Sequence, residues 1–185
     1  MKGRVSMFAT VPHRFTALLE EDPFAPALVL TRTGSRDRIW VRAAVEHRAV
    51  RIAGACAKRA VPFQARVAFT GHGTLDRLAA SLFVLATGRI LVDSPDADFV
   101  IDDEICRESE VSASPAYVLR CVTRSSDHAA VVTGLLTHGE LYRVAIGGRL
   151  PDSDFGRAIE SLALGVPVQV QGDQAVELRP LVYAA

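Results

Sequence analysis

The segment Thr-Arg-Ser-Ser-Asp-His at residues 123–128 places hydroxyls, a carboxylate and an imidazole within six residues. These are the three groups of a Ser-His-Asp hydrolase. Such triads are assembled from distant segments that the fold holds rigidly, so adjacency in one stretch is poor evidence for one. The chain also lacks the Gly-x-Ser-x-Gly turn that presents a serine nucleophile. We therefore predict a solvated loop here.

A second candidate group is His72, which stands between Gly71 and Gly73. An expected strand at residues 66–69 ends just before it, and α/β proteins often bind ligands at that end of a strand. Asp76 follows one turn later. A histidine and an aspartate alone specify neither a metal site nor an acid–base pair. The simpler explanation is that the two glycines permit a tight strand-to-helix turn.

Two other candidates, Cys121 and His138, also have simpler explanations. Cys121 would be a nucleophile only if its surroundings lowered its pKa, and its place at an expected strand end favours a packed apolar role. His138 follows Thr137, and Thr-His-Gly-Glu at residues 137–140 is a capping box that explains the segment without chemistry. His72, His138 and Cys121 are therefore weak catalytic candidates, and no metal site is predicted.

Short apolar strands alternate with helices, which predicts an α/β fold with a mostly parallel central sheet and helices on both faces. The chain is expected to close with a C-terminal β-hairpin around Gly172-Asp173. Helices are expected at residues 14–21, 43–59, 75–87, 138–146 and 153–164, the third capped by Thr74 and the last by Asp152. Strands are expected at residues 27–31, 38–41, 66–69, 90–92, 99–101, 116–121, 131–135, 166–171 and 176–180.

The length of 185 residues fits one α/β domain, residues 1–185. The acidic, serine-bearing stretch 102–114 is expected to be an exposed connection and is the one weak boundary. Within helix 43–59 a stripe of apolar residues is expected to face the core, with Arg48, Arg51 and Lys58 off it. That stripe consists of Val45, Ala49, Ile52, Ala53, Cys56 and Ala60.

The composition excludes several classes of function. Basic and acidic residues balance at 21 each, so there is no electrostatic footprint for nucleic acid or an anionic membrane. Three cysteines without metal-ligand spacing favour reduced thiols and a cytoplasmic location. The N-terminus lacks the apolar core of a secretory signal, and no run is long enough to span a bilayer. Only Lys2 and Lys58 are lysines, which leaves few sources for a catalytic lysine.

The order of the expected elements resembles the N-terminal part of adenylate-forming enzymes, the superfamily of acyl-CoA ligases, nonribosomal adenylation domains and luciferases. Residues 14–20 resemble the opening helix of that family, and residues 39–59 resemble its first amphipathic helix after a short strand. Residues 66–93 are similar to the strand–helix–Gly–strand unit that follows, and residues 98–102 to the next strand. Residues 116–119 stand where the phosphate loop of that family begins. Thr137-His138 matches the Thr-His before the helix that follows the loop.

The phosphate loop itself departs from the family. The family's loop is rich in Ser, Thr and Gly and ends in Pro-Lys-Gly, so that backbone N–H groups and a lysine surround the ATP phosphates. Residues 121–134 hold no lysine, and glycine appears only at their end. The resemblance leaves Arg124, Ser125, Thr137 and His138 as weak ligand-binding candidates, and neither ATP or AMP binding nor any other cofactor is expected.

The chain also stops before the regions that, in the family, complete the adenine and acyl pockets and supply a catalytic lysine. The resemblance thus predicts a truncated, degenerate relative without ligase activity of its own, an accessory, binding or scaffolding protein in a biosynthetic pathway. Its partner would be a second copy in a homodimer, a carrier protein, a synthase or a full-length ligase. Two alternatives stay open: a small enzyme with repurposed chemistry on an acyl or carrier-bound intermediate, and an acyl or nucleotide binder without turnover.

Overall fold

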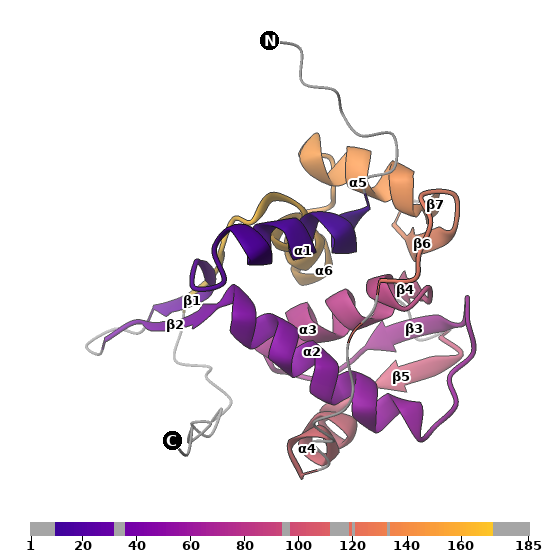
Figure 1. Ribbon diagram of the computed structural model, residues 1–185, viewed down its shortest axis with the longest axis horizontal. Helices are drawn as coiled ribbons and strands as arrows, with labels where there is room; N and C mark the ends of the chain where they lie inside the picture. The colour runs from indigo at the N-terminus through magenta and orange to yellow at the C-terminus, as the bar shows by residue number, and fades with distance from the viewer. Residues whose placement is uncertain are drawn as a thin grey trace.

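The computed structural model describes residues 10–31, 36–93, 97–111, 119, 121–132 and 134–171, and these form helices around two sheets (Figure 1). The helices are α1 (Val11–Glu21), α2 (Arg42–Ala57), α3 (Thr74–Ala86), α4 (Asp103–Val111), α5 (His138–Ile146) and α6 (Asp154–Leu164). The strands are β1 (Pro26–Thr31), β2 (Arg38–Val41), β3 (Arg66–Phe69), β4 (Ile90–Val92), β5 (Phe99–Ile101), β6 (His128–Val131), β7 (Leu135–Thr137) and β8 (Val168–Gln171). The predicted α/β class is confirmed.

The strands divide between a larger and a smaller sheet. The larger has the order β5-β3-β4-β6-β7, in which only the β6–β7 pair is antiparallel. In the smaller sheet β1 lies between antiparallel β2 and parallel β8, with Leu28 opposite Val168. The first strand of the expected C-terminal hairpin is therefore β8, which pairs with β1. Its second strand, at residues 176–180, lies outside the described residues.

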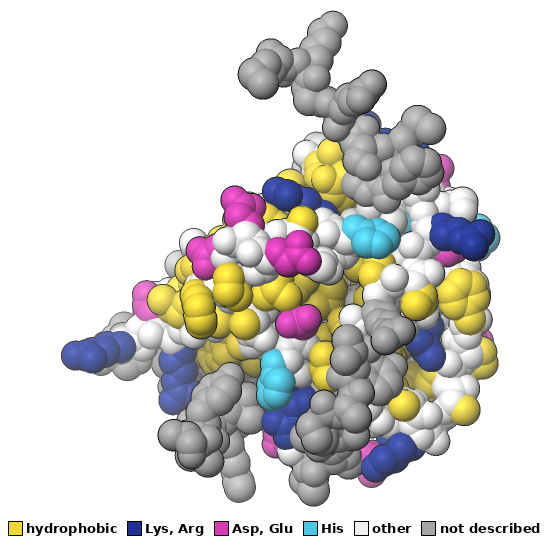
Figure 2. All heavy atoms as spheres, in the orientation of Figure 1, with side chains coloured by type: hydrophobic (Ala, Val, Ile, Leu, Met, Phe, Trp, Pro, Cys, Tyr) yellow, Lys and Arg dark blue, Asp and Glu magenta, His cyan; other side chains and the backbone are white. Residues whose placement is uncertain are grey.

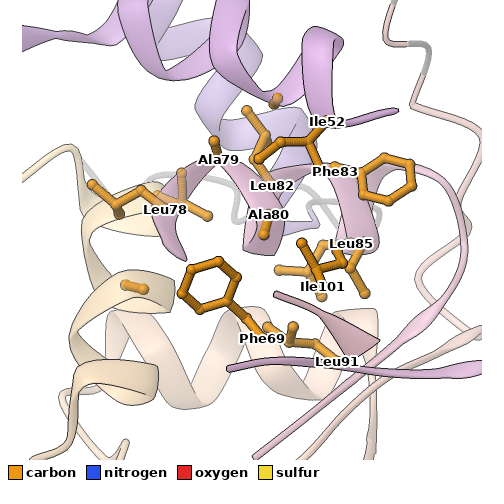
Figure 3. Packing of buried hydrophobic residues seen from close by; sticks show 14 of the residues in the cluster. Ile52, Phe69, Leu78, Ala79, Ala80, Leu82, Phe83, Leu85, Leu91 and Ile101 are labelled. Atoms are coloured by element: carbon orange, nitrogen blue, oxygen red, sulfur yellow. The ribbon is translucent and has the colours of Figure 1, made fainter. Parts of the chain in front are cut away.

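Helix α3 is the centre of the fold, because it is apolar on most of its surface and is covered on nearly every side. Leu78, Phe83 and Leu85 are each at most 2% exposed. Figure 3 shows Ile52 of α2 packed above α3, and Ile101 of the larger sheet below it. Helices α1, α2 and α6 all contact α3. Helix α3 also packs against β3 and β4, and apolar burial of this kind is the main source of stability.

The expectation that residues 102–114 form an exposed connection was wrong, because most of this stretch is helix α4, which packs against α2. Asp102 begins the helix by accepting hydrogen bonds from the Glu104 and Ile105 amides. Ile105 and Ser109 stand four positions apart on its inner face, and both are buried. The acidic side chains occupy the remaining faces, so the overall composition hid the inward stripe.

Several expected boundaries also differ. Residues 131–135 are not one strand; β6 and β7 form a hairpin there, closed by the Val132 amide bonding to the Gly134 carbonyl. Of the expected strand 116–121, Leu119 and Cys121 lie outside any strand, and the others lie beyond the described residues. The N-cap of α3 is Gly73 and not Thr74, and the N-cap of α6 is Ser153 and not Asp152. Within the described ranges, no helix is long and apolar enough to cross a membrane.

Candidate functional site

The structure pairs His72 with Asp103, where β3 and β5 end side by side. The His72 imidazole Nδ1 lies 2.6 Å from Asp103 Oδ2, and the His72 backbone amide donates to Oδ1 at 3.0 Å. These two hydrogen bonds, the side-chain bond first, hold the pKa of Asp103 below its usual value. The imidazole remains 73% exposed, so its Nε2 is accessible to solvent. A carboxylate that orients one ring nitrogen while the other faces outward is the arrangement of a general base.

Neither glycine beside His72 has a positive φ, so backbone conformation does not require glycine at these positions. What requires it is the close approach of neighbouring side chains to the backbone. A Cβ atom on Gly71 would lie 2.7 Å from the Asp103 carboxylate and 2.8 Å from the Phe69 ring. A Cβ atom on Gly73 would lie 2.8 Å from the Asp76 carboxylate. The tight turn was predicted correctly, but the glycines are needed so that two carboxylates can approach the backbone.

Asp76 belongs to a different cluster from His72. Its Oδ1 lies 2.5 Å from Arg48 Nε, and the two side chains are only 10% and 6% exposed. Arg48 also donates to Ser109 Oγ at 2.9 Å and to the Cys106 carbonyl at 3.0 Å. The guanidinium therefore ties together α2, α3 and α4, and this cluster has the contacts of a structural ion pair.

The prediction that Arg48 lies off the apolar stripe of α2 was wrong, since Arg48 is 5% exposed. The signal was present in the sequence. Arg48 stands three positions after Val45 and four before Ile52, which places it on the buried face. Asp103 and Ser109 were missed for another reason: both belong to a segment expected to have no regular structure.

The degenerate loop at residues 121–127 folds back on itself. The Arg124 amide donates to the Asp127 carboxylate at 2.8 Å, and the Asp127 amide donates to the Arg124 carbonyl at 3.1 Å. The Ser125 and Asp127 carbonyls accept the amides of Gly139 and His138, both at 2.9 Å. The loop is therefore fastened to the start of α5, and one of its amides is already bonded to a carboxylate of the same loop.

Thr137 is fully engaged as the N-cap of α5, as the capping box predicts. Its hydroxyl accepts from the Glu140 amide at 3.3 Å, and its own amide and hydroxyl donate to the Glu140 carboxylate, each at 2.9 Å. These bonds lower the pKa of Glu140. Thr137 therefore serves the helix end, with its hydrogen-bonding capacity largely used.

His138 is completely buried, and both of its ring nitrogens lack a hydrogen-bond partner among the described residues. Burial lowers its pKa to about 4, against a smaller opposing effect of Asp127. The imidazole is thus neutral at pH 7 and closed off from solvent. Its candidacy as a catalytic or ligand-binding group is not supported by this position.

The remaining candidates are not brought together. Cys121 is half-buried, with its sulfur 3.4 Å from Thr123 Oγ1 and no imidazole or guanidinium hydrogen-bonded to it among the described residues. Arg124 is exposed, and Ser125 contacts the start of α5 through its carbonyl. In the described part of the chain no group of three or more His, Cys, Asp or Glu side chains could hold a metal ion. Among the candidates, only His72 has a hydrogen-bonded partner, Asp103, in an arrangement that could support acid–base chemistry.

No family model and no curated protein matches the chain, whereas many solved structures do. The N-terminal domain of FACL13 from Mycobacterium tuberculosis matches with a TM-score of 0.66 and 12% identity, over 90% of this chain and 58% of that one. The N-terminal subdomain of NpsA from Klebsiella oxytoca matches with a TM-score of 0.64 and 15% identity, over 89% and 55%. A mutant form of coronafacic acid ligase from Pectobacterium brasiliense matches with a TM-score of 0.66 and 11% identity, over 89% of this chain and 46% of that one.

The chain thus spans about half the length of these relatives. At such low identity the similarity establishes the fold alone. The chain has the fold of the N-terminal subdomain of adenylate-forming enzymes.

Proposed function

We propose that this chain is a non-catalytic module with the fold of adenylate-forming enzymes, and that it acts by binding a protein partner in a biosynthetic pathway. The observation that carries the proposal is the closed loop at residues 121–127. The Arg124 amide, a backbone donor of this loop, is bonded to the Asp127 carboxylate, and that carboxylate gives the loop a negative charge that would repel a phosphate. His138, which the resemblance makes a ligand-binding candidate, is completely buried.

Titration with Mg-ATP and with AMP tests the loss of nucleotide binding. We expect no saturable heat in isothermal calorimetry and no ATP–pyrophosphate exchange with acyl or amino acids. The variant Asp127→Asn, which removes the charge and keeps the size, shows whether the carboxylate alone excludes the nucleotide. A micromolar affinity of the unmodified chain for either nucleotide would overturn this interpretation of the loop.

An apolar surface supports the proposal of a protein partner. Phe24, Leu164 and Val166 are 77%, 41% and 57% exposed. Phe24 precedes β1 and Val166 precedes β8, and these parallel neighbours begin at the same end of the smaller sheet. The Arg42 guanidinium bonds the carbonyls of both Asp22 and Gly165, so the two segments are fastened together. Figure 2 shows hydrophobic side chains gathered around α1 and toward this sheet. Exposed apolar patches of this kind mark interaction sites.

The first partner to test is a second copy of the chain, because a patch of this kind on a single chain can be covered by symmetric pairing. Light scattering after size exclusion should show a dimer that Phe24→Ser or Val166→Ser weakens. Val122→Ser, at a residue 59% exposed outside the patch, is the matched control. If the chain is monomeric, titration with purified carrier protein tests the other partner, a choice suggested by the similarity to NpsA-ThdA, an artificially fused adenylation–PCP di-domain. Absence of both interactions would contradict the binding role.

The His72–Asp103 pair favours a second candidate function, hydrolysis of an acyl thioester. His72 Nε2 would take a proton from water as the water oxygen attacks the thioester carbonyl, and the same proton would pass to the departing thiolate, giving an acid and a thiol. We expect His72→Gln and Asp103→Asn to lower thiol release from acyl thioesters by about a hundredfold or more. His47→Gln, an exposed histidine on α2, is the control. Equal rates in all variants, or no turnover, would exclude this function.

A further inference from the structure

A groove separate from the His72–Asp103 pair lies between α3, α6 and β8. Its volume is about 220 Å³, below the roughly 300–1,000 Å³ of pockets that take drug-sized ligands. Residues 74–78 line one part of it and residues 154–158 and 168–171 line the rest, so only the folded chain brings these two distant stretches of sequence together. Its polar lining consists of Thr74, Arg77, Asp154, Arg157, Gln169 and Gln171. A small and polar ligand is the kind that such a groove can take.

Arg77 is the residue that points to the class of ligand. Its guanidinium stacks over the Phe69 ring at 5.0 Å, and it is only half-exposed. Within the described residues no carboxylate pairs with it, and no acceptor receives a hydrogen bond from its guanidinium. The five N–H donors of the guanidinium therefore have no acceptor among the described residues and remain open to solvent or to a ligand. Such a planar donor set matches the two oxygens of a carboxylate or phosphate.

Arg157 of α6 provides a second guanidinium in the lining. It pairs with Asp154 at 3.1 Å and with Asp152 at 3.6 Å. Both carboxylates are strongly exposed, at 70% and 91%, so solvent screens these pairs and a ligand can compete for the guanidinium. The carboxylates of Asp154 and Asp152 balance much of the charge of Arg157, so Arg77 is the lining guanidinium that has no carboxylate partner among the described residues. The carboxamides of Gln169 and Gln171 add hydrogen-bond donors that do not change charge with pH.

We propose that this groove, the Arg77 groove, binds a small oxyanion, either a phosphate or a carboxylate, independently of the loop at residues 121–127. Isothermal calorimetry with inorganic phosphate, pyrophosphate, malonate and citrate, each against chloride at equal ionic strength, tests it. We expect saturable one-to-one binding of at least one of the four. Binding of the phosphates alone or of the carboxylates alone identifies the ligand class.

Three variants separate a built site from general charge attraction. Arg77→Ala should weaken binding about tenfold, because a hydrogen bond to a charged group is lost. Gln171→Glu, at an exposed position, should weaken it through like charge without disturbing the core. Arg149→Ala, an exposed arginine that does not line the groove, should have no effect. The proposal fails if no anion binds saturably, or if affinity falls equally in Arg149→Ala and Arg77→Ala.

Discussion

Replacing Asp76 by alanine is expected to lower the free energy of unfolding by about 3–5 kcal/mol, the cost of leaving one member of a buried ion pair alone. Arg48 and Asp76 are 2.5 Å apart and are both nearly excluded from solvent. The Arg48 guanidinium would keep its bonds to Ser109 and to the Cys106 carbonyl and its 3.8 Å pair with the half-exposed Glu110, but its charge would have no buried counterpart. Because the pair joins α2, α3 and α4, the loss should affect the whole cooperative unit.

Urea unfolding with linear extrapolation measures the effect. The double variant Arg48→Met with Asp76→Leu should recover most of the loss, since an apolar pair of similar volume avoids the uncompensated charge. Glu108→Ala, which breaks the partly exposed pairs with Arg59 and Lys58, is the control and should have a smaller effect because water screens these pairs. If Asp76→Ala and Glu108→Ala prove equally mild, the Arg48–Asp76 pair does not hold the three helices together.

The sequence predicted those parts of the fold that depend on local periodicity. Five residues of the predicted stripe face the core, namely Val45, Ala49, Ile52, Ala53 and Cys56, whereas Ala60 is exposed beyond the end of α2. The capping box at Thr137 begins α5, as predicted. Both signals depend on residues within a few positions of one another, so they can be recognised without information about the rest of the chain. The pairing of β1 with β8 joins segments 140 positions apart, as Leu28 opposite Val168 shows. No local pattern contains that information.

The sequence is less informative about the site, because there the position of a residue on its helix decides its burial more than its residue type does. Arg48 is charged and was assigned to solvent, yet it stands on the buried face of α2 and meets Asp76 there. The stretch around Asp103 is acidic and was expected to be irregular, although Ile105 and Ser109 have helical spacing. The His72–Asp103 pair follows from strand order, since β5 lies beside β3 only in the folded sheet.

The stability of the protein should fall as the pH drops from about 6.5 toward 4, because His138 resists protonation in the folded state. Its pKa is lowered from 6.5 to about 4 by burial, while Asp127 opposes and His13 adds to the shift. Between those two pH values the unfolded chain binds a proton at His138 that the folded chain does not, so protonation favours unfolding. A difference of about 2.5 units corresponds to about 3 kcal/mol, lost in full only below the folded pKa.

His138→Leu isolates this contribution from that of the carboxylates, which titrate in both proteins. Urea unfolding at pH 7, 6, 5 and 4 should show a smaller loss of stability in His138→Leu than in the parent chain. At pH 7 the variant should be at least as stable, because leucine leaves no buried nitrogen without a hydrogen-bond partner. His47→Gln, at an exposed position, should keep the parent's pH dependence. Parallel stability curves for His138→Leu and the parent would show that His138 is solvated in the folded state, contrary to the burial that closes it off from any ligand.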